Sequence, residues 1–372
     1  MEDISEITIE TIIDSLSEGV YVCDLDRRIT HWSKSAERIT GWHAEDIVGV
    51  HCYDDILNHI DKDGHPLCGK EYCPLHRAMV TGKASKDPLL IYAKGKDGKR
   101  IPTQVNVAPI HNAIGEVIGG VETFRDSSAL AHDLERAKAI QQLMLNKDMP
   151  EKAPAGFTTH YVPRDIVGGD YYAIKEINDG QYGFMLADVM GHGIASALYT
   201  MYLSSLWDQY HHFLENPGEF GGKMNRGLRK SLKGDDSFAT AMFGLVDFKK
   251  YTFRFTSAGG PNAILIHNDG AYEILESSGL PLGLLEDASY DENTIQVFQG
   301  DALLLVSDGA AEVRNAEGEL LGLDGLVEIL KKHGYPQNRI QMGILEEELL
   351  KYSNSIRLDD DLTLIEIHFD EL

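Results

Sequence analysis

The chain has 372 residues, a formal net charge of -25 at pH 7 and a sequence pI near 4.9. This acidic excess argues against nucleic acid or an anionic membrane as the main partner, because both need a basic protein face. The sequence shows no signal-peptide pattern and no apolar run of membrane-spanning length. We therefore expect a cytoplasmic protein with two domains.

The first 126 residues carry the pattern of an antiparallel sheet with helices inserted early. Alternating apolar residues between turn signals predict strands at 19–26, 28–32, 89–94, 100–110 and 117–124. The order resembles a PAS sensory domain, through Gly19 with Asp24, Trp32, Gly41-Trp42, the stretches 45–49 and 96–100, and Phe124-Arg125-Asp126. The resemblance implies a five-stranded sheet flanked by helices, often dimeric and often holding a ligand. We predict a PAS sensor domain at 1–126.

An insertion in this domain concentrates thiols and imidazoles. Three of the four cysteines and four of the fifteen histidines fall between His51 and His76. Thiolate and imidazole suit zinc, iron or haem, so we regard these residues as a possible sensor site: Cys52, Cys68, Cys73, His51 and His76. The spacing does not form a pair of Cys-x-x-Cys clips, however. A loop with buried structural thiols and solvated histidines explains the same pattern.

A helical connector is expected at 127–149. Apolar residues recur along it at spacings of four, three, three and four, at Leu130, Leu134, Ala137, Ile140 and Met144. A seam this narrow has little else to bury it. That favours pairing with the same helix of a second copy, and so a homodimer through the PAS domain and the connector. The alternative is a single helix packed on its own domain.

The remaining residues, 150–372, contain strand patterns that run into acidic residues. The apolar run 182–187 leads into Asp188, a glycine-rich turn and the buried-helix pattern 194–203. Asp188 is therefore expected at a strand end before a helix N-terminus, where a carboxylate and free backbone groups can bind metal and phosphate. His192 in that turn is either a proton donor to a leaving group or a turn histidine.

A second carboxylate is expected opposite Asp188. Asn178, Asp179 and Gly180 signal a turn between two strand patterns. If the hairpin is centred on Asp179, Asp170 faces Asp188 with Cβ atoms roughly 5 Å apart on one sheet face. Two carboxylates that close repel each other unless something positive lies between them. The alternatives are a register shifted by one residue and a solvated strand end.

Acidic residues abut apolar strand patterns at two further places. The run 302–307 ends at Asp308, and the acidic stretch 359–361 leads directly into the strand pattern 362–367. The order Gly-Gly-Asp, Asp-x-x-Gly-His-Gly, Ser-Asp-Gly, Asp-Asp-x-Thr resembles the PPM metal-dependent protein phosphatases, in the branch similar to stage II sporulation protein E. The resemblance covers about residues 140 to 370.

This resemblance implies an α-β-β-α sandwich phosphatase domain at 150–372 and a site for two divalent ions, Mn or Mg. The positions that match the family's ligands are the carboxylates of Asp170, Asp188, Asp308 and Asp360 and the backbone carbonyl of Val189. Asp360 is preferred to Asp361, because the first residue of that motif is the ligand in the wider family. All-oxygen ligands select hard ions. Relatives often carry aspartate where this chain has Ala173 and histidine where it has Gly260. These two differences leave undecided whether a third metal binds and how the rim around the substrate is built.

We therefore expect an α+β chain that acts as a sensor-regulated serine/threonine protein phosphatase, a hydrolase that uses a two-metal-activated water. The resemblance implies a phosphorylated STAS-type anti-sigma-factor antagonist as substrate, in partner-switching signal transduction. The main alternative is a catalytically degenerate PAS adaptor that binds its partner without turnover, and the intact aspartates argue against it. A nucleotide cyclase or kinase with a PAS input is disfavoured, because no glycine-rich phosphate loop followed by Lys-Ser/Thr is present.

Overall fold

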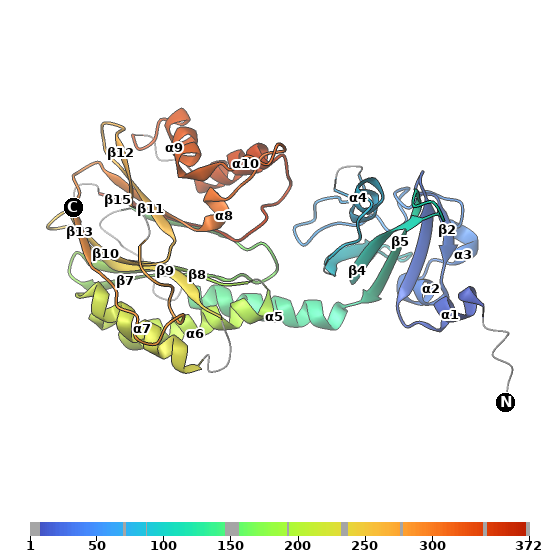
Figure 1. Ribbon diagram of the computed structural model, residues 1–372, viewed down its shortest axis with the longest axis horizontal. Coiled ribbons are helices and arrows are strands. Elements are labelled where there is room, and N and C mark those ends of the chain that lie inside the picture. The colour runs from blue at the N-terminus through green and yellow to red at the C-terminus, as the bar shows by residue number, and fades with distance from the viewer. Residues whose placement is uncertain are drawn as a thin grey trace. The chain divides into compact units, whose positions relative to one another are not determined.

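The computed structural model describes residues 8–69, 72–86, 88–145, 156–191, 193–231, 237–275, 278–337 and 341–369. The chain forms two compact units, Met1–Asp133 and Leu134–Leu372. Helix α5, Ser128–Leu145, contains the boundary between them (Figure 1). Within the described ranges, no helix combines the length and the apolar character that crossing a bilayer requires.

The N-terminal unit is a five-stranded antiparallel sheet with short helices (Figure 1). Its strand order is β2-β1-β5-β4-β3, so the first strand of the unit pairs with the last. The strands are β1 Gly19–Asp24, β2 Ile29–Trp32, β3 Leu89–Lys94, β4 Arg100–His111 and β5 Val117–Asp126. The helices are α1 Ile9–Ser15, α2 Lys34–Thr40, α3 Ala44–Ile47 and α4 Pro74–Thr81. The predicted PAS architecture is confirmed.

The C-terminal unit contains two five-stranded antiparallel sheets packed face to face, with helices outside (Figure 1). The first sheet has the order β13-β10-β9-β8-β7 and the second β12-β11-β14-β15-β6. The strands of the first are β7 Asp170–Asn178, β8 Gln181–Val189, β9 Ala239–Asp247, β10 Thr252–Ala258 and β13 Asn293–Gln296. Those of the second are β6 Phe157–Val162, β11 Asn262–Ile266, β12 Tyr272–Leu275, β14 Ala302–Val306 and β15 Leu362–His368. The predicted α-β-β-α sandwich is confirmed.

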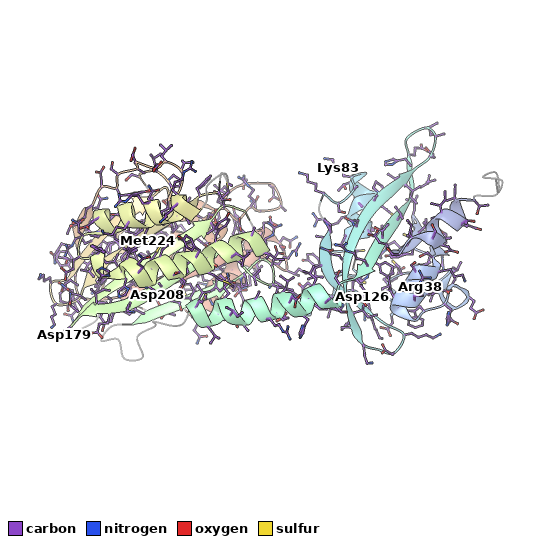
Figure 2. All side chains as sticks on the ribbon, turned by 90° about the horizontal axis from the view of Figure 1, so that it is seen from below. Arg38, Lys83, Asp126, Asp179, Asp208 and Met224 are labelled. Atoms are coloured by element: carbon purple, nitrogen blue, oxygen red, sulfur yellow. The ribbon has the colours of Figure 1, made fainter. Side chains whose placement is uncertain are left out.

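Three helices lie side by side over the first sheet: α5, α6 Ile194–Tyr210 and α7 Pro217–Ser231. Figure 2 shows them from below, with Met224 marking α7 and Asp208 marking α6. The second sheet is covered by α9 Gly322–Lys332 and α10 Met342–Ser353. The short helix α8, Asp308–Ala311, follows β14, and the 3-10 turn η2, His211–Phe213, follows α6.

The strands of the second sheet separate two cores. Leu303 and Leu305 of β14 lie in the core between the sheets, whereas Leu304 lies in the core beneath α9 and α10. Successive side chains of a strand point to opposite faces, so a strand covered on both faces must be apolar throughout. This explains the continuous apolar run in the sequence of β14.

The β7–β8 hairpin positions the first two predicted carboxylates. Asn178 pairs with Gln181 across the turn, whereas Glu176 pairs with Tyr182, so the register shifts by one residue between them. Such a β-bulge accommodates one extra residue in one strand. Beyond the bulge, the register pairs Asp170 with Asp188, as predicted.

Candidate active site

Asp170 lies at the base of the candidate site. It is the first residue of β7, its side chain is buried, and it pairs directly with Asp188 of β8. The Thr363 hydroxyl donates a hydrogen bond to Asp170 Oδ2 at 2.5 Å. The other oxygen, Oδ1, is buried and has no hydrogen-bond partner among the described residues. Because a buried, unsatisfied carboxylate oxygen is costly, this atom fits a position that ligates a cation.

The carboxylates around Asp170 repel one another. Burial, followed by the nearby Asp308 and Asp360, raises the pKa of Asp188 to about 7. Burial together with Asp360 and Glu312 raises the pKa of Asp308 to about 6. Burial and Asp188 also raise the pKa of Asp170. Repulsion of this kind is relieved when a multivalent cation binds.

The site opens to solvent on one side. Asp308 and Asp360 are exposed and Asp188 is half-buried, whereas Asp170 is buried beneath them. A phosphoryl group can therefore approach from the exposed side while Asp170 remains shielded from water.

Both carboxylate oxygens of Asp361 accept hydrogen bonds from the backbone, in contrast to Oδ1 of Asp170. Its Oδ1 accepts a hydrogen bond from the backbone N–H of Arg164 at 2.7 Å, and its Oδ2 accepts one from Gly169 at 2.5 Å. These bonds tie the end of the second sheet to the segment that precedes Asp170. Because both oxygens are engaged, the arrangement favours Asp360 over Asp361 as a ligand.

Two motif glycines allow the backbone segments of the site to approach closely. A Cβ at Gly309 would lie 2.0 Å from the carbonyl oxygen of Asp361, so no larger residue fits after Asp308. A Cβ at Gly169 would lie 3.1 Å from the carbonyl oxygen of Val189. The Val189 carbonyl thus lies beside the Gly-Gly-Asp segment.

Sequence reasoning missed the roles of Thr363 and Gln141. Gln141 of α5 is buried and donates through Nε2 to Gly168 O at 2.8 Å and to Thr200 Oγ1 at 2.9 Å. Its Oε1 accepts from the Gly168 N–H at 3.2 Å. The connector helix therefore binds the residue that lies two positions before Asp170. His192, left open between two roles, lies outside the described residues.

The predicted sensor cysteines lie in or near the core of the PAS unit. Cys52 and Cys73 belong to its apolar cluster, and Cys68 Sγ accepts a hydrogen bond from the His59 N–H at 3.0 Å. Burial raises the pKa of the Cys68 thiol to about 12, and burial also raises the pKa values of Cys52 and Cys73. The position of Cys52 and Cys73 in an apolar cluster is compatible with the structural interpretation.

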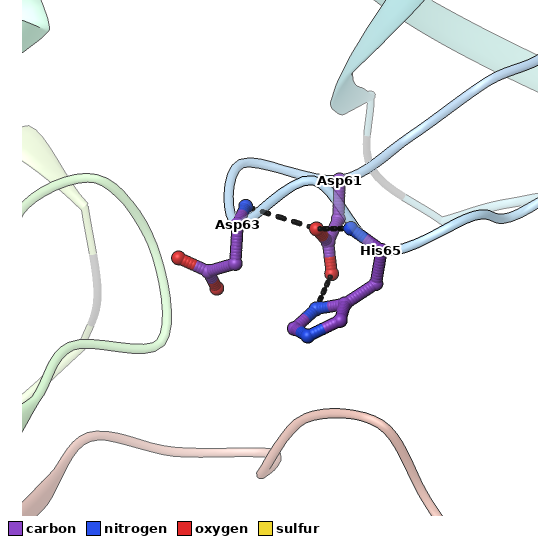
Figure 3. Close-up of side chains that lie close together, drawn as sticks. All are labelled: Asp61, Asp63 and His65. Atoms are coloured by element: carbon purple, nitrogen blue, oxygen red, sulfur yellow. Dashed lines mark hydrogen bonds and ion pairs between the residues drawn. The ribbon is translucent and has the colours of Figure 1, made fainter.

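Among the described residues, the predicted sensor histidines and thiols supply no three ligand atoms within 4.8 Å of one another, and neither do the aspartates of the candidate site. His51 Nδ1 lies 2.9 Å from Asp54 Oδ2, and His76 lies on α4. Within the described ranges, the one group of three potential ligands with atoms within 4.8 Å of one another is Asp61, Asp63 and His65 (Figure 3).

The hydrogen bonds of Asp61 account for the closeness of these three residues without a bound ion. Its Oδ1 accepts the backbone N–H groups of Asp63 and His65, both at 2.9 Å, and its Oδ2 lies 3.0 Å from His65 Nδ1 (Figure 3). An aspartate that accepts the N–H two residues later is a common turn motif.

Comparison with known proteins assigns both units. The family described as stage II sporulation protein E matches residues 178–370, just over half of the chain. The chain belongs to the stage II sporulation protein E family. A PAS fold matches residues 13–132. A PAS domain therefore precedes a PPM-type serine/threonine phosphatase domain of this family, whose members depend on divalent metal ions.

The relatives include two phosphatases of Bacillus subtilis (strain 168). The phosphoserine phosphatase RsbP is 27% identical over 183 residues, which cover 48% of this chain and 45% of RsbP. The phosphoserine phosphatase RsbU is 27% identical over 234 residues, which cover 63% of this chain and 69% of RsbU. The match to RsbP thus spans less than half of that family member.

A solved structure of the family fold is also similar. The SiaA-PP2C domain of Pseudomonas aeruginosa shares 22% sequence identity with this chain and superposes with a TM-score of 0.58. The match covers 65% of this chain and 98% of that domain. This likeness shows that the two share a fold.

Proposed function

We propose that this protein dephosphorylates phosphoserine or phosphothreonine on a STAS-domain anti-sigma-factor antagonist, under control of its PAS domain. The observation that carries the proposal is the pair Asp170 and Asp188, directly opposed, with a buried Asp170 Oδ1 that no described residue satisfies. RsbP and RsbU, which are phosphoserine phosphatases by name, support the substrate class. A site that is open on one side can also accept a phosphorylated residue on the surface of a partner protein.

The residues proposed to hold two divalent ions, Mn or Mg, are the carboxylates of Asp170, Asp188, Asp308 and Asp360 and the carbonyl of Val189. The donor set is entirely oxygen, which suits hard cations. When bound, such ions activate a water for in-line attack on phosphorus and neutralise charge on the phosphoryl oxygens.

The surrounding residues orient these ligands. Thr363 fixes the Asp170 carboxylate through Oδ2, which would leave Oδ1 available to a bound cation. Asp361 accepts the backbone N–H groups of Arg164 and Gly169, and Gln141 binds Gly168. Ligands fixed by neighbouring hydrogen bonds bind metal more tightly, because less freedom is lost on binding.

The connector helix is proposed to carry regulation and to form a homodimer together with the PAS domain. Two residues of the predicted seam are exposed, Ile140 at 49% and Met144 at 36%, whereas Leu130, Leu134 and Ala137 are half-buried. The seam thus retains apolar surface for a second copy. On the adjacent face of the same helix, Gln141 contacts the segment before Asp170.

The proposed function is tested with a STAS-domain protein phosphorylated by its cognate kinase. Purified full-length protein with Mn should release inorganic phosphate, and Asp188→Ala should abolish release while far-UV circular dichroism stays unchanged. The degenerate-adaptor alternative predicts instead that the wild-type protein binds the phosphoprotein and releases no phosphate. Activity that survives in Asp188→Ala would contradict the site assignment.

A further inference from the structure

Large apolar side chains are exposed at the start of α6, beside the candidate site. Met190, Ile194 and Leu198 are exposed by 46%, 50% and 59%. Ile194 and Leu198 lie four residues apart, so they share one helix face. On the opposite face, Leu203 and Trp207 are buried in the core. A helix that is apolar on both faces is normally covered on both.

A loop presents further apolar side chains close to the same motif. Leu280 and Leu284 are exposed by 40% and 38%. Between them, Leu282 exchanges two backbone hydrogen bonds with Ala239, at 2.9 and 2.8 Å, and Ala239 pairs with Val189 of the metal motif. The loop is therefore joined to the Val189 strand through a single intervening strand.

This loop is held rigidly. The buried side chain of Asn225 on α7 accepts the Gly283 N–H at 2.8 Å and donates to the carbonyl of Leu285 at 2.9 Å. The leucines of this loop are thus presented on a fixed backbone.

We call the five exposed residues the apolar rim: Met190, Ile194, Leu198, Leu280 and Leu284.

Among the described residues of its own unit, the neighbours of α6 contact its flanks and leave this face exposed. On one flank, Gln141 of α5 contacts Thr200, and on the other, the Tyr202 hydroxyl donates to Gly227 O of α7 at 3.1 Å. Figure 2 shows α6 between these two helices. An apolar surface that stays exposed beside a reactive centre marks a site of protein contact.

We propose that the apolar rim is the docking surface for apolar side chains that flank the phosphoserine of the protein substrate. The proposal rests on the proposed function. Phosphoserine has a short side chain, so the substrate backbone must come close to Asp188 for the phosphate to reach the ligands. Met190 and Ile194 follow Asp188 by two and six residues and are exposed, so they are the apolar side chains that a substrate bound at Asp188 meets first along the chain. Because the rim carries no charge, it selects apolar neighbours rather than acidic or basic ones.

The test uses two phosphoserine peptides of equal length and charge, one with leucines and one with serines on either side of the phosphoserine. The small substrate p-nitrophenyl phosphate reports the metal centre without touching the rim. Wild-type protein with Mn should show a kcat/KM about tenfold higher for the leucine peptide. The double variant Ile194→Gln/Leu198→Gln should remove this preference and keep its turnover of p-nitrophenyl phosphate.

A matched control is Phe298→Gln, which also removes an exposed apolar side chain of the same unit, at 61% exposure. Phe298 lies before β14, whereas Asp308 lies after it, so the control is at the opposite end of that strand. It should retain the leucine preference. The proposal is overturned if wild-type protein does not prefer the leucine peptide or if the double variant keeps the preference. Absence of p-nitrophenyl phosphate hydrolysis in the wild-type protein would instead refute the proposed function, and the docking proposal with it.

Discussion

The Thr363 hydroxyl gives the two oxygens of the Asp170 carboxylate different surroundings. It satisfies Oδ2 and leaves the buried Oδ1 without a partner in the part of the chain that the structure describes. A hydrogen bond to one oxygen fixes the carboxylate plane and so directs the second oxygen. At the scale of single residues, the site therefore depends on polar neighbours as much as on ligands.

Replacement of Thr363 tests this role. Thr363→Val keeps the side-chain shape and removes the hydrogen bond to Asp170, so the Mn concentration for half-maximal turnover should rise about 10- to 100-fold. Thr256→Val is a matched control, because Thr256 is also buried in a strand and its hydroxyl has no hydrogen-bond partner within the described ranges. That control should leave the Mn dependence unchanged. Equal Mn dependence in Thr363→Val and wild-type protein would contradict the positioning role.

The PAS core contains a second buried carboxylate, Glu122. It accepts a hydrogen bond from the Tyr21 hydroxyl at 3.0 Å, and its Oε1 lies 3.6 Å from His59 Nε2. Burial raises the pKa of Glu122 from 4.5 to about 8, although the Tyr21 bond opposes this. Burial, assisted by Arg100, lowers the pKa of His59 from 6.5 to about 4. Near pH 7 both side chains are therefore uncharged.

These shifts predict a loss of stability at alkaline pH. The raised pKa of Glu122 gives stability that is complete below its unfolded value of 4.5 and is lost as the pH rises to about 8. The lowered pKa of His59 gives stability that is complete above 6.5 and is lost as the pH falls to about 4. The two effects oppose each other between 4.5 and 6.5, so the net loss falls between 6.5 and 8 and amounts to about 2 kcal/mol.

Differential scanning calorimetry of the full-length protein between pH 6.5 and 8 measures this loss. Glu122→Gln cannot ionise and should make the decline smaller than in the wild-type protein, because the raised pKa of Asp188 contributes to it separately, whereas the exposed Glu45→Gln should keep the whole decline. A decline of the same size in Glu122→Gln would show that another group is responsible.

At the scale of elements, α5 presents two different faces. One face packs on the phosphatase unit through Gln141 and Leu145, and the other exposes Ile140 and Met144. If the exposed face pairs with a second copy as proposed, the helix can pass a change from that pair to the segment before Asp170, because packed helices shift between discrete arrangements.

The inner face is tested by Gln141→Ala. This change removes the hydrogen bonds to Gly168 and Thr200, and loss of buried hydrogen bonds costs about 1 to 3 kcal/mol. We expect turnover at limiting Mn to fall about tenfold, because the segment before Asp170 is less firmly held. The adjacent and exposed Gln142→Ala is the control and should behave like the wild-type protein. Identical kinetics of the two variants would show that Gln141 contributes to packing and does not position the segment before Asp170.

The outer face is tested by Ile140→Glu. A charge in the exposed seam should weaken the proposed dimer without touching a metal ligand, because a carboxylate in an apolar helix pair must be desolvated. Sedimentation equilibrium gives the dissociation constant, which should rise at least about tenfold. The neighbouring Ala139→Glu places the same charge outside the seam and should have little effect. A wild-type monomer would contradict the dimer proposal.

At the scale of the whole molecule, much of the architecture could be predicted from local patterns. Asp170 was placed opposite Asp188 from a turn signal alone, and the register holds because a bulge before Asn178 offsets the two-residue turn. The hydrogen bonds of Thr363 and Gln141 could not be predicted, since they join residues 193 and 59 positions apart in sequence. The possible sensor site rests on the clustering of cysteines and histidines in the sequence, whereas burial of Cys52 and Cys73 is a property of the folded core.

The most direct measurement of the central claim is calorimetric titration of the protein with Mn, combined with turnover of p-nitrophenyl phosphate. The wild-type protein should bind two ions per chain and hydrolyse the substrate. Asp308→Asn is nearly isosteric and lies at a strand end, so it should stay folded, bind Mn more weakly and lose turnover. Full Mn binding and unchanged turnover in folded Asp308→Asn would contradict the account.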